Sequence, residues 1–584
     1  MIVTIFVVLV AASTASVMLT TSLTGSKNAT VNKNTTSARY RAEGGLAAGQ
    51  QALLQAVASY RNVPTSGSVD IVGESVEYEI TNTGVQTTET DSSGLQSSHD
   101  GYRIDATGSI FTTNETAHQF MDVVTIPIFQ FAVFYAGDLE INPGPSMTLS
   151  GRVHTNGDLY LNCGNTLTLD TNYVRAVGNL YRHRKDDPSR STGTIDVRQW
   201  VVNPFDPAEP SVFAPLNSKS QMDALGVGSI SGYDSNFSNG YDADGDGLFT
   251  GPNDWLPWAL GALDYWGEPD GYSSSGSTIQ TADHGLAEAM VPSVNTIGMY
   301  EAVEGGDYAL DGSGVYGPAP GGPGSGTHDK GYFHGQADLS IITLPDGSWE
   351  AFDSSGVDIT SVLNDHGVVT IDTIYDARQG GDVQVTQVDI DVLNNSGAFP
   401  ANGLLYASSY GTANGTDLKG VQLVNGSEIA YGLSVVTDGA AYIQGDYNVT
   451  NKKGASVIAD AVNLLSNNWT DNAVKGPGDL PGAAETTYNL AFITGNHETH
   501  VGSYNGGFEN LPRFHENWSG VNCNIAGSFV NAWESQFATG AWEYGGDRYK
   551  APRRNWSYDT FFNNVANLPP FTPSVVLAEN VALW

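Results

Sequence analysis

Positively charged residues are scarce in this sequence. Only 25 Lys and Arg stand against 63 Asp and Glu, which gives a formal net charge of −38 over 584 residues. Phosphate backbones are bound by clustered Lys and Arg, and no such cluster is visible, so nucleic acid is not expected as a partner. Binding to an anionic membrane surface is disfavoured for the same reason. Copies of so acidic a chain repel each other, so a polymer would need screening salt or bound cations.

Cysteine is nearly absent, and this excludes a metal site built on several cysteine ligands. The sequence contains Cys163 and Cys523 and no other cysteine. Two alternatives follow. The pair forms one long-range disulfide if the protein is exported, or both residues are buried thiols.

The motifs of common enzyme classes are also missing. There is no glycine-rich phosphate loop and no Gly-x-Ser-x-Gly nucleophile turn. Residues 497–500 (HETH) place two histidines three positions apart, which is not the spacing of a helical zinc site. Asp158 near His154 could imitate a polysaccharide lyase or hydrolase, but carboxylates are so common here that such a pair indicates little. We therefore expect no enzymatic activity.

Charge, proline and glycine are all missing from residues 1–19 (MIVTIFVVLVAASTASVML). A helix of this length spans roughly 28 Å, about the thickness of the hydrocarbon core of a bilayer. The segment can be an export signal, a membrane anchor, or a helix that buries itself among copies of its own kind. As a signal it lacks a basic n-region, although residues 12–16 could serve as a cleavage site.

The nearest positive charges all follow this apolar segment. They are Lys27, Lys33, Arg39 and Arg41. For an uncleaved anchor, the positive-inside rule would place the body of the chain in the cytoplasm. That conflict disappears if a short basic leader has already been removed from a processed N-terminus.

A helical pattern resumes over residues 37–60. Leu46, Leu53 and Val57 recur there at helical spacing, and Pro64 supplies a stop. A continuous helix from the N-terminus to residue 60 would be about 90 Å long.

Two features of this region point to a known family. They are the uncharged segment that starts at residue 1 and the run at residues 42–46 (AEGGL), which opens an amphipathic second half. The region resembles the N-terminal helix of bacterial type IV pilin-like proteins, particularly the large minor-pilin and pseudopilin class. The resemblance implies that a prepilin peptidase removes a basic leader, that Met1 is then methylated, and that the helices bundle in the centre of a filament. Most such pilins carry glutamate at the fifth mature position, whereas this chain has Ile5, which is similar to subunits that cap or initiate filaments.

After Pro64 the helical period gives way to short β-patterns. Residues 153–161 (VHTNGDLYL) match residues 435–443 (VVTDGAAYI) at Val, Thr, Asn or Asp, Gly, Tyr, and Leu or Ile. The Asn-Gly or Asp-Gly pair marks a tight turn between two short strands. Regular short strands with a turn at each step predict a β-solenoid or a stacked β-sandwich, and we favour the solenoid, although a plain hairpin explains the match almost as well. The expected fold class is α+β, with a long N-terminal helix followed by a mainly β body and a loop-rich insertion.

Changes of composition divide the chain into six expected segments. They are a pilin-like helix at 1–62 (hydrophobic at 1–19), a β-rich domain at 63–133, a first β-solenoid block at 134–200, a Gly/Asp-rich insertion at 201–335, a second β-solenoid block at 336–470, and an aromatic-rich C-terminal region at 471–584.

The insertion contains a pattern typical of a calcium-binding loop. Oxygen ligands at positions 1, 3 and 5, glycine at position 6 and a carbonyl at position 7 are what a wrapped calcium ion needs. The bidentate acid expected at position 12 is replaced by Asn253, and Asp254 could substitute for it in a longer loop. We expect this segment to bind calcium, which would rigidify the insertion. The alternative is an exposed acidic turn without a metal. The predicted ligands are Asp242, Asp244, Asp246, Leu248, Thr250 and Asp254.

Eleven Asn-x-Ser/Thr sequons occur in a chain rich in Asn, Ser and Thr, where several arise by chance. As glycosylation candidates they indicate surface exposure only weakly. The sequons begin at Asn28, Asn34, Asn114, Asn236, Asn394, Asn414, Asn425, Asn448, Asn468, Asn517 and Asn555.

The sequence therefore predicts a structural subunit of an extracellular type IV pilus-like filament at the cell surface. The N-terminal helix would hold the protein in the inner membrane before assembly and would then pack against the helices of other copies. One alternative is a secreted or anchored β-solenoid that binds or degrades glycans. Another is a minor adhesin at the tip of a pilus built from other subunits.

Overall fold

The computed structural model describes residues 2–583, apart from 92–93, 172, 182, 188–192, 200–211, 216–278, 283–285, 301–329, 345, 411–417, 472–477, 501, 541 and 543–547. The chain forms two compact units. The helical unit comprises Met1–Glu89, Ser97–Thr125 and Val576–Trp584. The β unit comprises Thr90–Gln96 and Ile126–Val575.

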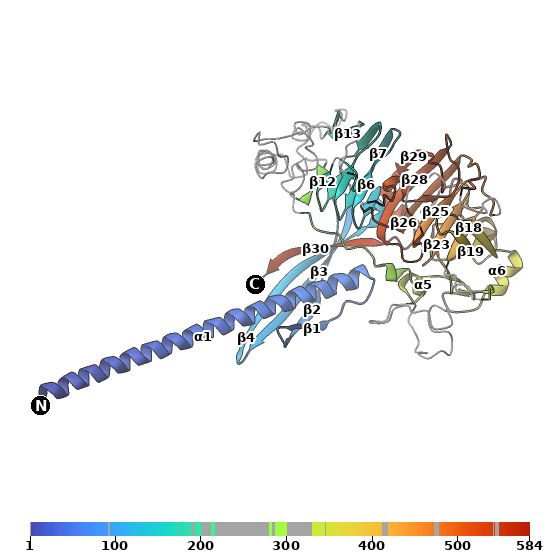
Figure 1. Ribbon diagram of the computed structural model, residues 1–584. Coiled ribbons are helices and arrows are strands. Elements are labelled where there is room, and N and C mark those ends of the chain that lie inside the picture. Colours follow the sequence, from blue (N-terminus) through green and yellow to red (C-terminus); the bar gives the residue numbers. More distant parts are fainter. Residues whose placement is uncertain are drawn as a thin grey trace. The chain divides into compact units, whose positions relative to one another are not determined.

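The helical unit combines one long helix with a five-stranded sheet (Figure 1). Helix α1 runs continuously over Ile2–Ala58, which confirms the predicted N-terminal helix. The sheet has the order β1-β2-β3-β4-β30. Its strands are β1 (Ser66–Ile71), β2 (Glu74–Thr90), β3 (Gln96–Ile110), β4 (Thr113–Pro127) and β30 (Ser574–Leu583).

Alternation along β2 explains why this sheet has one covered face and one open face. Val76, Tyr78 and Ile80 are buried, whereas Glu77 and Glu79 between them are exposed. Successive side chains of a strand point to opposite faces, so the apolar set packs beneath α1 and the acidic set faces away.

The β unit begins with three coils of three short strands each. Every strand pairs in parallel with its counterpart in the next coil, as β5–β8–β11, β6–β9–β12 and β7–β10–β13. The strands are β5 (Val133–Tyr135), β6 (Leu139–Ile141), β7 (Met147–Ser150), β8 (Val153–Thr155), β9 (Leu159–Leu161), β10 (Thr166–Asp170), β11 (Val174–Ala176), β12 (Leu180–Tyr181) and β13 (Thr194–Gln199).

A second series of coils uses two sheets, and its parallel stacking continues beyond residue 470. The strands β20, β22, β24, β26 and β28 belong to one sheet, and β19, β21, β23, β25 and β27 to the other. Their bounds are β18 (Val369–Asp376), β19 (Gly381–Asp389), β20 (Leu404–Ser409), β21 (Lys419–Val424), β22 (Leu433–Val436), β23 (Ala440–Gln444), β24 (Ala455–Ile458), β25 (Ala461–Leu465), β26 (Thr486–Asn496), β27 (Arg513–Phe514), β28 (Asn522–Glu534) and β29 (Arg553–Tyr558).

Shorter elements flank the two series. Strand β17 pairs antiparallel with β16, and β14 pairs antiparallel with β13. Their bounds are β14 (Val212–Pro215), β15 (Ile279–Gln280), β16 (Leu339–Thr343), β17 (Trp349–Asp353), α5 (Tyr332–Gln336), α6 (Thr360–His366) and α7 (Ile390–Asn395).

The pairing decides between the solenoid and the hairpin. In both matching segments the Asn-Gly or Asp-Gly turn joins strands of different sheets, β8 to β9 and β22 to β23, so each turn is a corner of a coil. The last long strand, β28, pairs in parallel with β5, the first strand of the first series. The two series therefore form one continuous stack, in which β28 of the second series lies beside β5 of the first.

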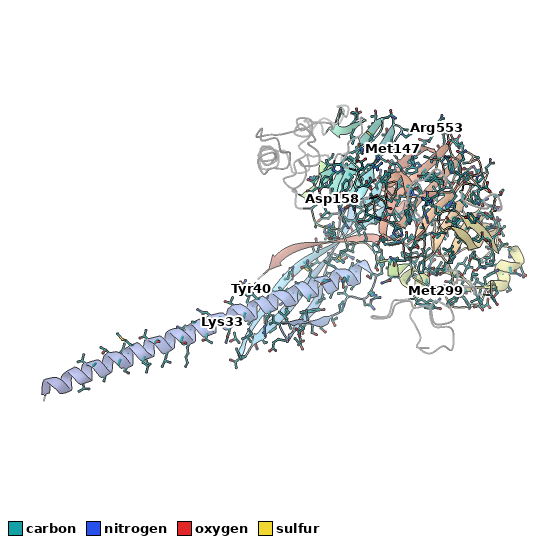
Figure 2. The ribbon with its side chains drawn as sticks, viewed as in Figure 1. Lys33, Tyr40, Met147, Asp158, Met299 and Arg553 are labelled. Atoms are coloured by element: carbon teal, nitrogen blue, oxygen red, sulfur yellow. The ribbon has the colours of Figure 1, made fainter. Side chains whose placement is uncertain are left out.

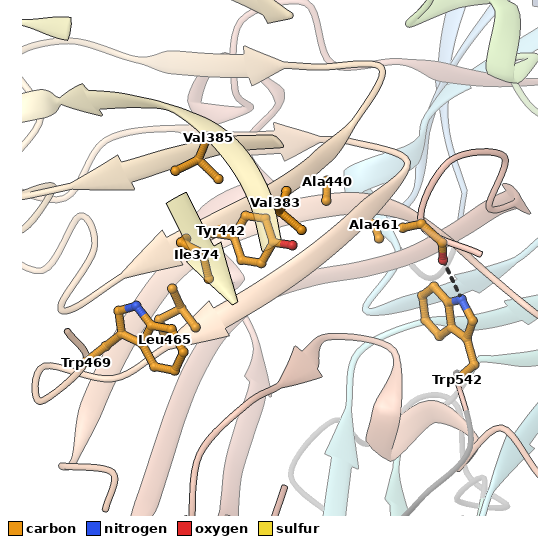
Figure 3. Packing of buried hydrophobic residues seen from close by; sticks show 10 residues of the cluster. Ile374, Val383, Val385, Ala440, Tyr442, Ala461, Leu465, Trp469 and Trp542 are labelled. Carbon is orange, nitrogen blue, oxygen red and sulfur yellow. Dashed lines mark hydrogen bonds between the residues drawn. The ribbon is translucent and has the colours of Figure 1, made fainter. Parts of the chain in front are cut away.

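Apolar side chains fill the interior of the second series. One cluster joins Ile374, Val383 and Tyr442 with two tryptophans, Trp469 and Trp542, all at most 4% exposed (Figure 3). The indole nitrogen of Trp542 donates to the carbonyl oxygen of Ala538 at 3.1 Å, so the buried N–H is satisfied. Aromatic residues near the C-terminus therefore serve the core of the solenoid.

Candidate functional site

The first half of α1 carries a series of exposed apolar side chains. We call residues 2–36 the stem; its side chains are described from Leu9 onward. Val17, Met18 and Leu19 are 64%, 73% and 64% exposed, and Leu23 is 58% exposed. Exposed apolar side chains that continue along one helix indicate a surface made for contact with another body.

The second half of α1 packs on the sheet, and the AEGGL run explains how. Ala42 and Leu46 are buried at 0% and 3% exposure. A Cβ atom at Gly45 would lie 2.7 Å from Val76 of β2, so only glycine allows this approach. The run is therefore the contact that holds the helix against its sheet, while the stem extends beyond it.

Membrane crossing by a helix has a length and hydropathy requirement. Within the part of the chain that the structure describes, no helix is sufficiently long and apolar to meet it.

A ladder of side chains runs along one corner of the first three coils. Asp138 Oδ1 accepts from the backbone N–H of Asp158 at 2.8 Å, and Asp158 Oδ1 accepts from Asn179 at 2.7 Å. A Cβ atom at Gly157 or Gly178 would overlap the carboxylate of the coil below. The corner thus requires Gly followed by Asp or Asn, a pattern that recurs at 137–138, 157–158 and 178–179.

The corner meets a small polar cavity of about 20 Å³ where the two series join. Tyr135, Asp138, Glu140 and Glu498 contribute to its lining. Lys185 Nζ lies 2.7 Å from Asp138 Oδ2 and 3.2 Å from Glu498 Oε2. The ammonium group of this lysine therefore occupies the position between the two carboxylates that a bound cation would take.

Glu509 is a fully buried carboxyl beside this cavity. Its Oε1 accepts from the backbone N–H of Asn142 at 3.0 Å, whereas Oε2 has no hydrogen-bond partner. Burial raises the pKa of Glu509 to about 7, against the opposing influence of Arg554. The carboxyl is therefore near its titration point at neutral pH, where it destabilises rather than stabilises the fold.

We expect Glu509→Gln to stabilise the protein relative to the wild type increasingly as the pH rises from about 5 to about 7. Between the unfolded pKa near 4.3 and the folded pKa near 7, folded Glu509 holds a proton that the unfolded chain lacks. Because of this group, the free energy of unfolding of the wild type falls by about 1.4 kcal/mol per pH unit in this range. The glutamine variant has no such group, so its free energy of unfolding lacks this decrease. Thermal or urea unfolding of both proteins across this range measures the difference.

Exposed Glu89→Gln is the matched control and should track the wild type at every pH. Other titrating groups, such as His154 and His515, whose pKa values burial lowers to about 4, cancel in this comparison. A difference between Glu509→Gln and wild type that does not change with pH would contradict the assignment.

A second polar network is buried inside the second series. Asp376 Oδ2 accepts from the Tyr442 hydroxyl at 2.7 Å, and His515 Nδ1 lies 3.7 Å from Asp376 Oδ1. Burial acts to raise the pKa of Asp376, but His515 and Arg513 outweigh it and hold it at about 2. All four side chains are fully or almost fully buried, so the network has a structural role.

The predicted calcium ligands Asp242, Asp244, Asp246, Leu248, Thr250 and Asp254 lie outside the described residues, as does Met1. Among the residues that the structure describes, no group of three or more His, Cys, Asp or Glu could hold a metal ion. Within the HETH segment, His497 Nδ1 lies 3.4 Å from Glu534, and His500 contacts the carbonyl oxygen of Glu498.

Of the two alternatives for the cysteines, the structure has the buried thiols. The thiol of Cys163 donates to the carbonyl oxygen of Thr194 at 3.3 Å. Burial raises the pKa of the Cys523 thiol to about 12, so it stays protonated and unreactive at neutral pH. The two residues lie in different coils, Cys163 after β9 and Cys523 in β28.

The sequons differ in exposure. Asn448 is buried, and its amide donates to Lys453 and Asn489, so this candidate is inaccessible in the folded chain. Asn236 and Asn414 lie outside the described residues. The exposed candidates are Asn28, Asn114, Asn425, Asn468, Asn517 and Asn555, and Asn34 and Asn394 are half-buried.

The corner ladder and the residues of the polar cavity were not predicted. A signal for the ladder exists, because Gly-Asp-Leu, Gly-Asp-Leu and Gly-Asn-Leu recur at 137–139, 157–159 and 178–180. Comparison of the chain with itself at a period near 20 residues finds it. Nothing local marks Glu509, because its burial depends on the contact between the two series.

The comparisons with known proteins assign no family. No family model matches the sequence, and no curated protein matches it. Among solved structures, the chain aligns with the competence-associated pilin ComZ from Thermus thermophilus at 10% identity, over 94% of this chain and 97% of that one. The TM-score of 0.16 does not establish a common fold.

Proposed function

We propose that this chain is a structural subunit of an extracellular, type IV pilus-like filament. The observation that carries the proposal is the division of α1 into a base, residues 37–58, that packs on its own sheet and a stem whose apolar side chains are exposed. A helix of this kind can pack against identical helices while the sheet and the β unit remain outside the bundle. Before assembly, the apolar segment at residues 1–19 would reside in the inner membrane.

Helix packing supplies a sufficient driving force. Seven large apolar side chains are exposed between residues 9 and 31: Leu9, Val10, Val17, Met18, Leu19, Leu23 and Val31. Fully burying each one contributes roughly 1.5–3 kcal/mol, or roughly 10–20 kcal/mol in total, before the apolar residues 2–8 are counted. Ordering each immobilised side chain costs about 0.5–1.5 kcal/mol, which is smaller.

A single charge in the stem should therefore abolish filaments. We expect material sheared from cells that produce the wild-type protein to contain filaments in negative-stain electron microscopy, and Val17→Asp to contain none. An unpaired carboxylate buried between apolar helices costs several kcal/mol per subunit. Mass spectrometry of the filament subunit should find residue 1 methylated.

Thr36→Asp is the matched control, because it adds the same charge at an exposed position at the end of the stem. It should assemble like the wild type. Full-length wild-type protein that is secreted as single particles with its stem intact, and without filaments, would overturn the proposal. Subunit stoichiometry in the filaments separates a major subunit from a tip adhesin.

A further inference from the structure

The first 42 residues carry a positive charge that the rest of the chain does not share. Residues 1–42 contain four basic residues and no acidic residue, a net charge of +4, so residues 43–584 carry −38 − 4 = −42. The four are Lys27, Lys33, Arg39 and Arg41. In a filament of such subunits, this is the segment that can attract a neighbouring copy electrostatically.

Two of these cations have partners in their own unit, and two do not. Arg39 Nε lies 3.1 Å from Glu43, and Arg41 donates to the carbonyl oxygen of Ser109 at 2.7 Å. Lys27 and Lys33 are exposed, and neither makes an ion pair or a side-chain hydrogen bond with any residue that the structure describes. Figure 2 marks Lys33 on the stem and Tyr40 at the start of the base.

The open face of the β1–β2 hairpin presents the complementary charge. Glu77 and Glu79 are exposed on β2, and they lie opposite Ser68 and Ser66 of β1 rather than opposite a cation. Neither glutamate has an ion-pair partner among the described residues. Like the lysines, they belong to the helical unit.

The helix sets the distance between the two charged surfaces. The hairpin packs beside Gly44 and Gly49, because these glycines approach Ile71 and Tyr78. Lys33 lies 11 residues before Gly44 in the sequence, and Lys27 lies 22 residues before Gly49. At 1.5 Å per residue, the cations precede the hairpin by about 17–33 Å along the helix axis. They are therefore too far away to be partners within one copy.

We propose that Lys27 and Lys33 of one copy pair with Glu77 and Glu79 of a second copy that is displaced by about 17–33 Å along the stem. This inference rests on the proposed function and adds the contact that sets the axial offset between subunits. The pairing turns part of the mutual repulsion of these acidic chains into attraction. An anionic lipid headgroup is the other partner with suitable chemistry, but the −42 charge on the rest of the chain disfavours it.

Charge reversal tests the pairing in the full-length chain. We expect Lys27→Glu with Lys33→Glu to reduce the pelletable filament fraction about tenfold, and Glu77→Lys with Glu79→Lys to do the same, because each places like charges opposite each other. The quadruple variant recreates attraction with the signs exchanged and should restore filaments. Glu89→Lys with Asp365→Lys adds the same net charge as the glutamate reversal at two other exposed positions and should leave assembly unchanged.

The outcomes separate this inference from the proposed function. If filaments form in the wild type, are lost in Val17→Asp and persist in both charge reversals, the proposed pairing is wrong. The proposed function would still stand in that case. A lysine reversal that abolishes filaments without rescue in the quadruple variant would also overturn it, and would point to anionic lipid. Absence of wild-type filaments would overturn the proposed function itself.

Discussion

Replacement of Asp376 by Asn is expected to lower the free energy of unfolding of the β unit by about 3–5 kcal/mol. Asp376 is fully buried and accepts from the Tyr442 hydroxyl and from the backbone N–H of Arg378. Arg513 is also fully buried, and its charge helps to hold the pKa of Asp376 at about 2. The amide would remove a negative charge from the surroundings of the buried Arg513 guanidinium, and an uncompensated buried charge is strongly destabilising.

Urea unfolding followed by circular dichroism measures this loss. Asp365→Asn is the control, because Asp365 is exposed at the end of α6, and we expect its effect to stay within about 0.5 kcal/mol. A loss below about 1 kcal/mol in the Asp376 variant would mean that the network does not depend on its carboxylate.

Gly527→Ala is expected to destabilise the β unit by about 3 kcal/mol or more, through one added methyl group. Gly527 lies in β28, opposite Leu490 of β26. A Cβ atom there would overlap the carbonyl oxygen of Leu490, a backbone atom that cannot rotate away. Relief requires the two strands to separate, and β28 also pairs with β5 and β29, so the disturbance reaches both series.

Gly482→Ala provides the comparison, since a Cβ atom at Gly482 meets nothing within 4 Å and its φ is not in the left-handed region. Thermal unfolding of this control should match the wild type. If Gly527→Ala unfolds at the same temperature as the control, β26 and β28 do not approach as closely as the structure has them.

The N-terminal helix and the α+β class could be predicted because both depend on local sequence. Residues 1–19 and 37–60 each have the composition or spacing of a helix, and α1 joins them into one helix over Ile2–Ala58. The solenoid was predicted from one repeated corner, and the parallel pairing of β22 with β24 and of β23 with β25 confirms it over the hairpin.

The buried polar groups could not be predicted, because their environment is assembled from distant parts of the chain. Asp376 meets His515 across 139 positions, and Asn142 donates to Glu509 across 367. No local pattern distinguishes Glu509 from the other acidic residues of so acidic a sequence. Its partner Asn142 belongs to the first series, so the two parts of the chain must come together before Glu509 is buried.

The route of the chain between the two units has a mechanical consequence. The chain leaves the helical unit after β4 and returns to it as β30, and β30 pairs beside β4. The segments that follow β4 and precede β30 are joined by a hydrogen bond, since the backbone N–H of Ile128 donates to the carbonyl oxygen of Pro573 at 2.8 Å. Tension transmitted through a fibre of stems therefore need not stretch the part of the chain between Ile128 and Pro573, because a backbone hydrogen bond already joins its two ends. A region connected in this way can be exchanged for another of different shape while the load-carrying part stays the same.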